Sequence, residues 1–294
     1  MFPTILKLGP VSVHSYGLMM AIAFLLATYL ATRDIAKHGL NAGVASDTAF
    51  WCLLVGLAGT RILHIIMFPE FYSWSRPLGW IAIWQGGLVF QGAIPPALAV
   101  IYFNLRRHQM PFWKTIDIAA PYVALGHAIG RVGCFLNGCC YGQRTDLPWG
   151  VQFPRIPFDL SKAGVTGSPA YMDHCQRYAL SYDTDLWSLP VHPTQLYSVA
   201  ALCLLCVTLL LLRKCCWRFP GFIICWYFIL YSAGRFVIEM FRGDHNPTRF
   251  LSLSDQQVFC VLSVVAGLVL LTFLSAYWRR IRAKNPEAST ENVE

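Results

Sequence analysis

The chain has 294 residues, of which 56% are hydrophobic and 13% are charged, and its formal net charge is +8. Soluble domains are roughly a quarter charged, so this composition excludes an ordinary soluble protein and indicates an integral membrane protein. The positive charge does not indicate nucleic-acid binding, because the basic residues lie at the ends of apolar segments and form no stripe with interleaved aromatics. Anchoring to anionic lipid of the bilayer explains them better.

Seven apolar segments approach the length of about 20 residues that a helix needs to cross a bilayer. Glycine, proline and polar residues interrupt the third and the fourth. The sequence therefore predicts an all-α integral membrane protein that forms a single domain, 1–294. Its seven transmembrane helices are expected near 15–33, 45–67, 86–105, 116–137, 194–213, 221–241 and 256–278.

The distribution of lysine and arginine predicts the orientation of these helices. One alternating set of connections holds twelve of them, whereas the other holds eight spread over much longer loops. Short cytoplasmic loops retain positive charge, so we expect the N-terminus outside and the C-terminus in the cytoplasm. Only Lys7 precedes the first apolar segment and no convincing cleavage site follows it, so this segment is expected to be retained as a helix.

The longest connection, 143–193, is rich in proline, aspartate, serine and tyrosine and has no clear helical period. Loops of this length are uncommon unless they are functional or disordered. The aromatic and proline content favours an ordered external cap between the fourth and fifth helices. The polar end of the chain, 279–294, is expected to be a cytoplasmic tail.

Charged side chains inside the predicted helices are the first candidates for function, because each costs at least ~2.5 kcal/mol to insert. They include Arg61, Arg131, Arg235 and Glu239. The spacing of Arg235 and Glu239 lets them pair on one helix face. The remaining positive charge favours an anionic ligand, and a lipid phosphate suits the bidentate fork of arginine. The alternative is a structural role, in which Arg131 caps backbone carbonyls of a broken helix.

Glycines and hydrogen-bonding side chains gather at the helix ends predicted to face outward. Gly126, Gly130 and Gly133 recur about once per turn and permit close helix packing, whereas Asn137–Gly138 falls where the fourth helix should end and turn. The fifth helix is expected to start at Pro193. Further polar groups lie near these ends, where an interfacial position is the alternative for Tyr16: His14, Tyr16, His192, Thr194, Gln195 and Tyr197.

The chain has eleven cysteines, and four of them, Cys134, Cys139, Cys140 and Cys175, lie near the predicted outer face. One alternative is a metal or redox site formed by the first three with His127. The spacing is no standard zinc pattern and adjacent cysteines rarely ligate one ion, so a disulfide of Cys139 or Cys140 is favoured, with Cys175 as one conceivable partner. Neither a metal nor a cofactor is expected.

Six blocks of sequence resemble, in order, the prolipoprotein diacylglyceryl transferases of the bacterial inner membrane, and the resemblance covers nearly the whole chain. The blocks are HSYGLM (14–19), GTRIL (59–63), GGLVFQGA (86–93), GRVGCFLNGCCYG (130–142), HPTQLY (192–197) and YSAGRFVIEMFR (231–242).

This resemblance implies transfer of the diacylglyceryl group from phosphatidylglycerol to the lipobox cysteine thiol of preprolipoproteins, which forms a thioether and releases glycerol 1-phosphate. It implies a multi-pass protein of the bacterial inner membrane whose partners are that lipid, the lipobox of the signal peptide and the bilayer, but not nucleic acid. Arg131, Arg235 and Glu239 are then the expected catalytic residues. The expected substrate-binding residues are His14, Tyr16, Arg61, Gln91, Asn137, Gly138, Gly142, His192 and Tyr231.

Three positions depart from the pattern of the best-known members of the family. Gln91 replaces a histidine, Cys134 an asparagine and Cys139 a glutamate, so no general base carries over from the family. Candidates for this role are His14, His192 and Glu239, and the alternative is stabilisation of a thiolate by the arginines. The alternatives are a paralogue with a different acceptor and a lipid-binding protein without transferase activity. A transporter is disfavoured, because the two halves of the chain show no inverted repeat.

Overall fold

The computed structural model describes residues 4–8, 11–72, 78–81, 87–155, 168–180, 185–244, 249–250 and 253–284. Its contacts form two compact units. One is Thr28–Ala119, and the other combines Met1–Ala27 with Ala120–Glu294. The predicted single domain therefore stays a prediction, and each unit is described by itself.

Among the described residues, six helices are long and apolar enough to cross a membrane. The shortest has 18 residues and is about 27 Å long, close to the ~30 Å of a bilayer core. The prediction of a helical, multi-pass membrane protein is confirmed. The six helices are α1 (Ser15–Lys37), α2 (Ala42–Met67), α5 (Phe112–Asn137), α7 (Thr194–Cys216), α8 (Phe222–Glu239) and α9 (Asp255–Lys284).

The third predicted span, 86–105, is not a helix of spanning length. A 3₁₀ turn, Phe90–Ala93, leads into α4 (Ile94–Arg107), which has 14 residues and is about 21 Å long. Two prolines stand at the start of α4, where their missing N–H groups cost nothing, whereas inside a longer helix each would remove a backbone hydrogen bond. Glycine and proline thus shorten the helix that is expected here.

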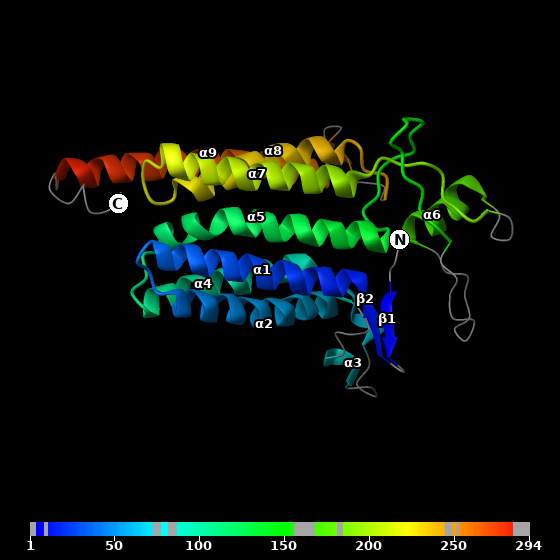
Figure 1. Ribbon diagram of the computed structural model, residues 1–294, viewed down its shortest axis with the longest axis horizontal. Helices are drawn as coiled ribbons and strands as arrows, with labels where there is room; N and C mark the ends of the chain where they lie inside the picture. The colour runs from blue at the N-terminus through cyan, green and yellow to red at the C-terminus, as the bar shows by residue number, and fades with distance from the viewer. Residues whose placement is uncertain are drawn as a thin grey trace. The chain divides into compact units, whose positions relative to one another are not determined.

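The unit Thr28–Ala119 is built on α2 and α4, which pack side by side (Figure 1). At Gly59 in α2 and Gly92 in the 3₁₀ turn before α4, the two backbones approach closely. A Cβ on either glycine would lie 2.3 Å from the other's carbonyl oxygen. Asn104 Nδ2 donates to Thr48 Oγ1 at 2.7 Å across the same interface. At the other end lies a small core of Ile35, Val44, Ala45, Leu105, Met110 and Ile118. The rest of this unit contains a 3₁₀ turn, Pro69–Phe71, and α3 (Leu78–Ile81).

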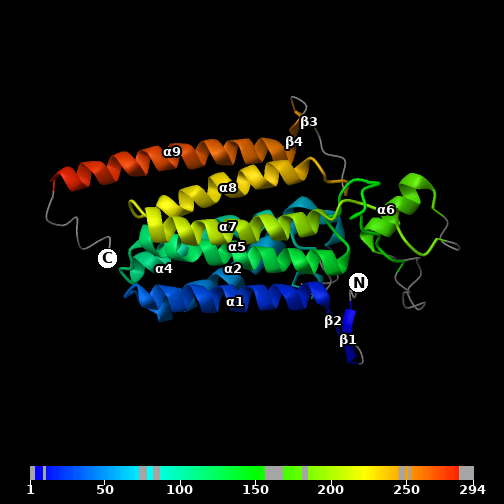
Figure 2. The same cartoon turned by 45° about the horizontal axis from the view of Figure 1, so that its top comes forward.

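The second unit contains the first part of α1, the part of α5 from Ala120 onward, and helices α6 to α9. Helices α8 and α9 lie side by side along most of their length (Figures 1 and 2). The start of α1 packs against α5 through glycines, since a Cβ on Gly126 would lie 3.0 Å from Ala27 Cβ and one on Gly133 would lie 3.0 Å from Met19 Cβ. This confirms that the glycines of α5 permit close helix packing.

Two short antiparallel hairpins add strands that the sequence analysis did not predict. Strand β1 (Thr4–Leu8) pairs with β2 (Val11–His14), which leads directly into α1. Strand β3 (Arg249–Phe250) pairs with β4 (Leu253–Ser254), which leads into α9. Each hairpin therefore precedes a long helix in the chain (Figure 1).

The described part of the 143–193 connection is ordered and contains a helix, α6 (Pro169–Tyr178), which the sequence analysis did not predict. Ser168 caps α6 by accepting from Tyr171 N, and Pro169 occupies its first turn. Tyr141, Phe153, Ala170 and Val191 form a small core beneath it. At the far end of the chain, α9 continues to Lys284, so the expected tail begins as helix.

The close approach of Gly59 and Gly92 leads to a prediction about stability. Gly92→Ala would place a methyl group against the Gly59 carbonyl oxygen, and we expect overpacking to destabilise the fold by about 1–3 kcal/mol. Gly17→Ala is the matched control, because a Cβ there meets no atom within 4 Å. Thermal unfolding in detergent measures both, and equal midpoints for the two variants would contradict the tight packing.

Candidate functional site

A cavity of about 210 Å³ lies between α5, α7 and α8 in the second unit. Leucine and isoleucine side chains form much of its wall. Arg131 and Arg235 both line it, together with His127 and Tyr231. The structure thus brings three of the predicted site residues to one cavity and adds His127, which the sequence analysis considered only as a metal ligand.

Arg235 is paired within its own helix, as the sequence spacing predicts. Its Nη2 lies 2.6 Å from Glu239 Oε2, and both side chains are buried. Arg242 lies 3.9 Å from the same carboxylate oxygen and binds Asp244 through two bonds of 2.8 and 2.5 Å. Burial lowers the pKa of Arg242, but the hydrogen bond and the charge attraction of Asp244, together with other nearby negative groups, raise the pKa above its ordinary value. Two arginines and two carboxylates therefore form one chain of charges.

Arg131 differs from these arginines. Its Nε donates to His127 Nε2 at 3.3 Å, one turn earlier on α5. Among the residues that the structure describes, no carboxylate lies within 4.0 Å of its guanidinium. The hydrogen bond needs an unprotonated His127 Nε2, so the histidine adds no negative charge. The cavity therefore keeps an uncompensated positive charge at Arg131.

Aromatic rings hold the opposite wall of this cavity in place. Tyr231 stacks on Tyr227 with ring centroids 5.8 Å apart and planes 6° apart. Its ring also lies 5.5 Å from the ring of His127. His127 contacts both Tyr231 on α8 and Arg131 on α5. It therefore holds the Tyr231 ring in position relative to the Arg131 guanidinium.

Helix α5 ends at Asn137 in a Schellman motif. Gly138 adopts φ +74°, its N–H donates to Phe135 O at 3.2 Å, and Cys139 N–H donates to Cys134 O at 3.2 Å. The predicted turn at Asn137–Gly138 is thus confirmed. A Cβ at Gly138 would lie 2.9 Å from Phe153 and from Ser168, so glycine is needed for space as well as for conformation.

Side chains from the first turn of α7 bind the two residues that follow Gly138. Gln195 Nε2 donates to Cys139 O at 2.8 Å, and Thr194 Oγ1 donates to Cys140 O at 2.7 Å. Both side chains are almost fully buried. In the described part of the chain, Gln195 Oε1 is buried without a hydrogen-bond partner, which is uncommon for a native polar group.

Gly142 lies where three stretches of backbone meet. Its N–H donates to His192 O at 2.9 Å, while Gln143 N–H donates to Phe241 O and Gly243 N–H donates to Tyr141 O. A Cβ on Gly142 would lie 2.5 Å from His192 O and 2.7 Å from Phe241 O. These main-chain contacts, which we call the backbone clasp, join the ends of α5 and α8 to the start of α7.

The other predicted site residues of this unit surround the clasp or the start of α1. The His192 ring lies 5.2 Å from that of Phe241, and its Nδ1 lies 3.2 Å from the Tyr197 hydroxyl. Tyr16 is half exposed, and Gly133 is close enough for an added Cβ to touch its ring at 3.4 Å. His14, the last residue of β2, is exposed.

Arg61 and Gln91 belong to the other unit. Arg61 is buried, and it donates to the carbonyl oxygens of Gly79, Trp80 and Gly87 while its guanidinium lies over the Tyr72 ring at 5.0 Å. These contacts give Arg61 a structural role in holding the segment before α4. Gln91 lies exposed in the 3₁₀ turn. Substrate binding by either residue stays a prediction.

Comparison with known proteins identifies the family. A model of the family described as "Prolipoprotein diacylglyceryl transferase" matches residues 3–273. This chain belongs to that family. It is 34% identical to a "Phosphatidylglycerol--prolipoprotein diacylglyceryl transferase" of Synechococcus elongatus, over 90% of this chain and 83% of that protein. A protein with the same description from Serratia proteamaculans is 31% identical, over 95% of this chain and 94% of that protein. Another, from Neisseria meningitidis, is 30% identical, over 91% of this chain and 93% of that protein.

The structure adds residues to the candidate site that sequence reasoning did not assign to it. His127 precedes Arg131 by four residues, a spacing that places both on one helix face and could have revealed their contact. Arg242 and Asp244 follow Glu239 beyond the end of α8, where no helical spacing predicts their pairing. Only the fold shows that Thr194 and Gln195 bind the cysteine carbonyls.

The bond from Thr194 to Cys140 O yields a second prediction. Thr194→Val keeps the shape but leaves the Cys140 carbonyl without its partner, and we expect a loss of about 1–3 kcal/mol in stability. Ser198→Ala is the matched control, since Ser198 Oγ donates only within its own helix, to Thr194 O. If Thr194→Val unfolds at the same temperature as Ser198→Ala in detergent, this bond does not stabilise the loop.

Proposed function

We propose that this protein transfers the diacylglyceryl group of phosphatidylglycerol to the lipobox cysteine thiol of preprolipoproteins. Family membership and the descriptions of the relatives support this activity. The observation that carries it is the cavity in which Arg131 has no carboxylate partner among the described residues and lies with a second arginine, Arg235. A cavity in a membrane-embedded bundle that keeps a positive charge suits a lipid phosphate.

The reaction is a substitution at the glycerol carbon that bears the phosphate. The sulfur of the acceptor cysteine, having lost its proton, forms a bond to this carbon, and the bond from carbon to the phosphate oxygen breaks. Glycerol 1-phosphate leaves with the bonding electrons, so negative charge accumulates on the phosphate. Guanidinium groups that are already in position stabilise this charge in a site of low polarity. They lower the activation barrier because they do not have to move during the reaction.

We assign different tasks to the two arginines. Arg131 offers its unoccupied N–H groups to the phosphate, and its bond to His127 holds the guanidinium in place. Arg235 adds a second positive charge, oriented by Glu239 at 2.6 Å. Glu239 thus acts on the reaction through Arg235. We assign the following residues to substrate binding: His14, Tyr16, Arg61, Gln91, Asn137, Gly138, Gly142, His192 and Tyr231.

No residue of the chain is assigned as the general base. Gln91 cannot accept a proton at neutral pH, and the Nε2 of His127 already accepts from Arg131. The acceptor thiol instead loses its proton in an electropositive site, because nearby cations stabilise a thiolate.

The proposed activity predicts the effect of removing each guanidinium. We expect Arg131→Ala and Arg235→Ala each to lower kcat by about 10²–10³-fold, the range for loss of one donor to a developing charge. Transfer from phosphatidylglycerol to a lipobox peptide by purified protein measures this. Arg144→Ala is the control, since Arg144 is exposed and lies 3.9 Å from the Asp146 carboxylate. Unchanged transfer in either folded alanine variant would overturn the phosphate assignment.

A paralogue that acts on a different acceptor would bind the lipid but fail to support lipoprotein maturation. Expression in a transferase-depleted bacterium separates the two functions. We expect growth to be restored by the natural protein and not by Arg131→Ala at equal abundance. Failure of the well-expressed natural protein would favour the paralogue.

We also propose a topology with seven spans in a bacterial inner membrane, in which α4 completes the third span. The segment 143–193 then forms an external cap. Because six spans place both termini on one side and seven place them on opposite sides, reporter fusions at the two ends test this. We expect an external N-terminus and a cytoplasmic C-terminus, whereas two termini on the same side would exclude a seventh span.

A further inference from the structure

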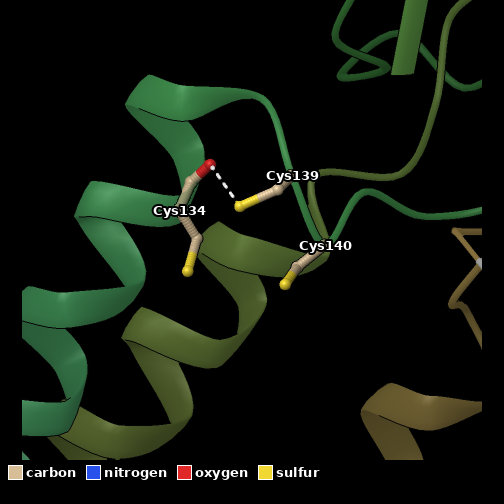
Figure 3. A group of neighbouring side chains, drawn as sticks. All are labelled: Cys134, Cys139 and Cys140. Atoms are coloured by element: carbon tan, nitrogen blue, oxygen red, sulfur yellow. Dashed lines mark hydrogen bonds between the residues drawn. The ribbon is translucent and has the colours of Figure 1, made fainter. Parts of the chain in front are cut away.

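Three cysteine side chains converge where α5 ends. The Sγ atoms of Cys134, Cys139 and Cys140 all lie within 4.8 Å of one another. Figure 3 shows them coming together from the last turn of α5 and the two residues after its turn. In the described chain, no other histidine, cysteine or carboxylate belongs to this group. Among the residues that the structure describes, no disulfide involves Cys134, Cys139 or Cys140, and His127 contacts Arg131.

The first pair is brought together by the Schellman motif. This motif places the residue after the left-handed glycine beside the residue five positions earlier, where a hydrophobic contact is usual. Here these two positions are Cys139 and Cys134. Cys139 Sγ lies 3.7 Å from Cys134 O as well (Figure 3). The geometry of the helix end therefore brings the side chains of Cys134 and Cys139 close together.

The third cysteine joins them because of an unusual backbone conformation. Adjacent residues on an extended chain point to opposite sides, which is why neighbouring cysteines rarely share one ion. Cys140 has φ +59°, in the left-handed region that residues other than glycine seldom adopt. This turns its side chain back toward Cys134 (Figure 3). The argument from sequence against a metal at this motif does not hold for this conformation.

The surroundings hold this arrangement in place. The carbonyl groups of Cys139 and Cys140 are each fixed by a buried side chain of α7, at 2.8 and 2.7 Å. Cys134 is 8% exposed, while the other two cysteines are half-buried and can be reached. The positive charges of Arg131 and Arg242 act on Cys140 across a short distance. A complex of one divalent ion with three thiolates carries a net negative charge, which these two arginines would stabilise.

The geometry points to a binding site for a thiophilic divalent cation of the Zn²⁺ class, with Cys134, Cys139 and Cys140 as its three protein ligands. Zinc–sulfur bonds of about 2.3 Å place three ligand sulfurs about 4 Å apart, so small side-chain rotations suffice. Thiolates select soft ions of this kind over Mg²⁺ or Ca²⁺. The thiol protons pass to solvent as the ion binds, and a fourth position stays open for water.

Cadmium is the probe for this site, because its bonds to thiolate absorb in the ultraviolet. Full-length reduced protein in detergent is titrated with Cd²⁺, and we expect one tightly bound ion per chain, displaced by Zn²⁺. Cys134→Ser, Cys139→Ser and Cys140→Ser should each weaken binding at least about tenfold, on the scale of damage to protein metal sites. The matched control is C215S/C216S, which removes another adjacent pair, exposed at the end of α7. It should keep the absorption.

Alkylation gives a second measurement that needs no variant. Zn²⁺ should slow the modification of Cys139 and Cys140 by iodoacetamide but leave that of Cys215, exposed at the end of α7, unchanged. The proposal is overturned if reduced protein shows no charge-transfer absorption, or if the absorption survives in all three serine variants. It is also overturned if two of the three thiols form a disulfide and the protein takes up no Cd²⁺ after that disulfide is reduced.

Discussion

A guanidinium inside an apolar helix must find its partners within the protein, because the hydrocarbon around it supplies none. The three arginines of the predicted spans meet this constraint in three ways. Arg61 binds backbone carbonyl groups, and Arg235 binds a carboxylate. Arg131 has a neutral histidine, which satisfies one N–H and leaves its charge uncompensated. The three arginines therefore differ in what each one already binds.

The second unit is organised around the end of α5. A single left-handed glycine turns the chain, positions two cysteines and leads to the backbone clasp. Side chains from α7 then hold the turn by its carbonyl groups. The cavity with the arginines lies along the same helix, one to two turns before the cysteines. A change in the conformation of this turn can thus shift Arg131, because both lie at the same end of α5.

The sequence predicted those features that depend on local rules. Six long helices, the pairing of Arg235 with Glu239 and the turn at Asn137–Gly138 follow from hydropathy, helical spacing and glycine chemistry. It did not predict α6, which is short and polar, although Ser168–Pro169 is a recognisable helix start. Nor could it place Thr194 or Gln195, because their partners lie more than fifty residues away in the chain. The convergence of the cysteines depends on the φ angle of Cys140, which no pattern of side chains specifies.

The backbone clasp also constrains how the protein is made. Its hydrogen bonds join residues near 142, 192 and 242, and each needs both of its partners. When α5 has emerged from the ribosome, the glycine turn can form, but the strand-like contacts of Gly142 must wait for His192. They are completed only when Gly243, beyond α8, has been synthesised. The part of the molecule that holds the candidate site is therefore among the last to be assembled, so the arginines reach their final surroundings only after most of the protein is in the membrane.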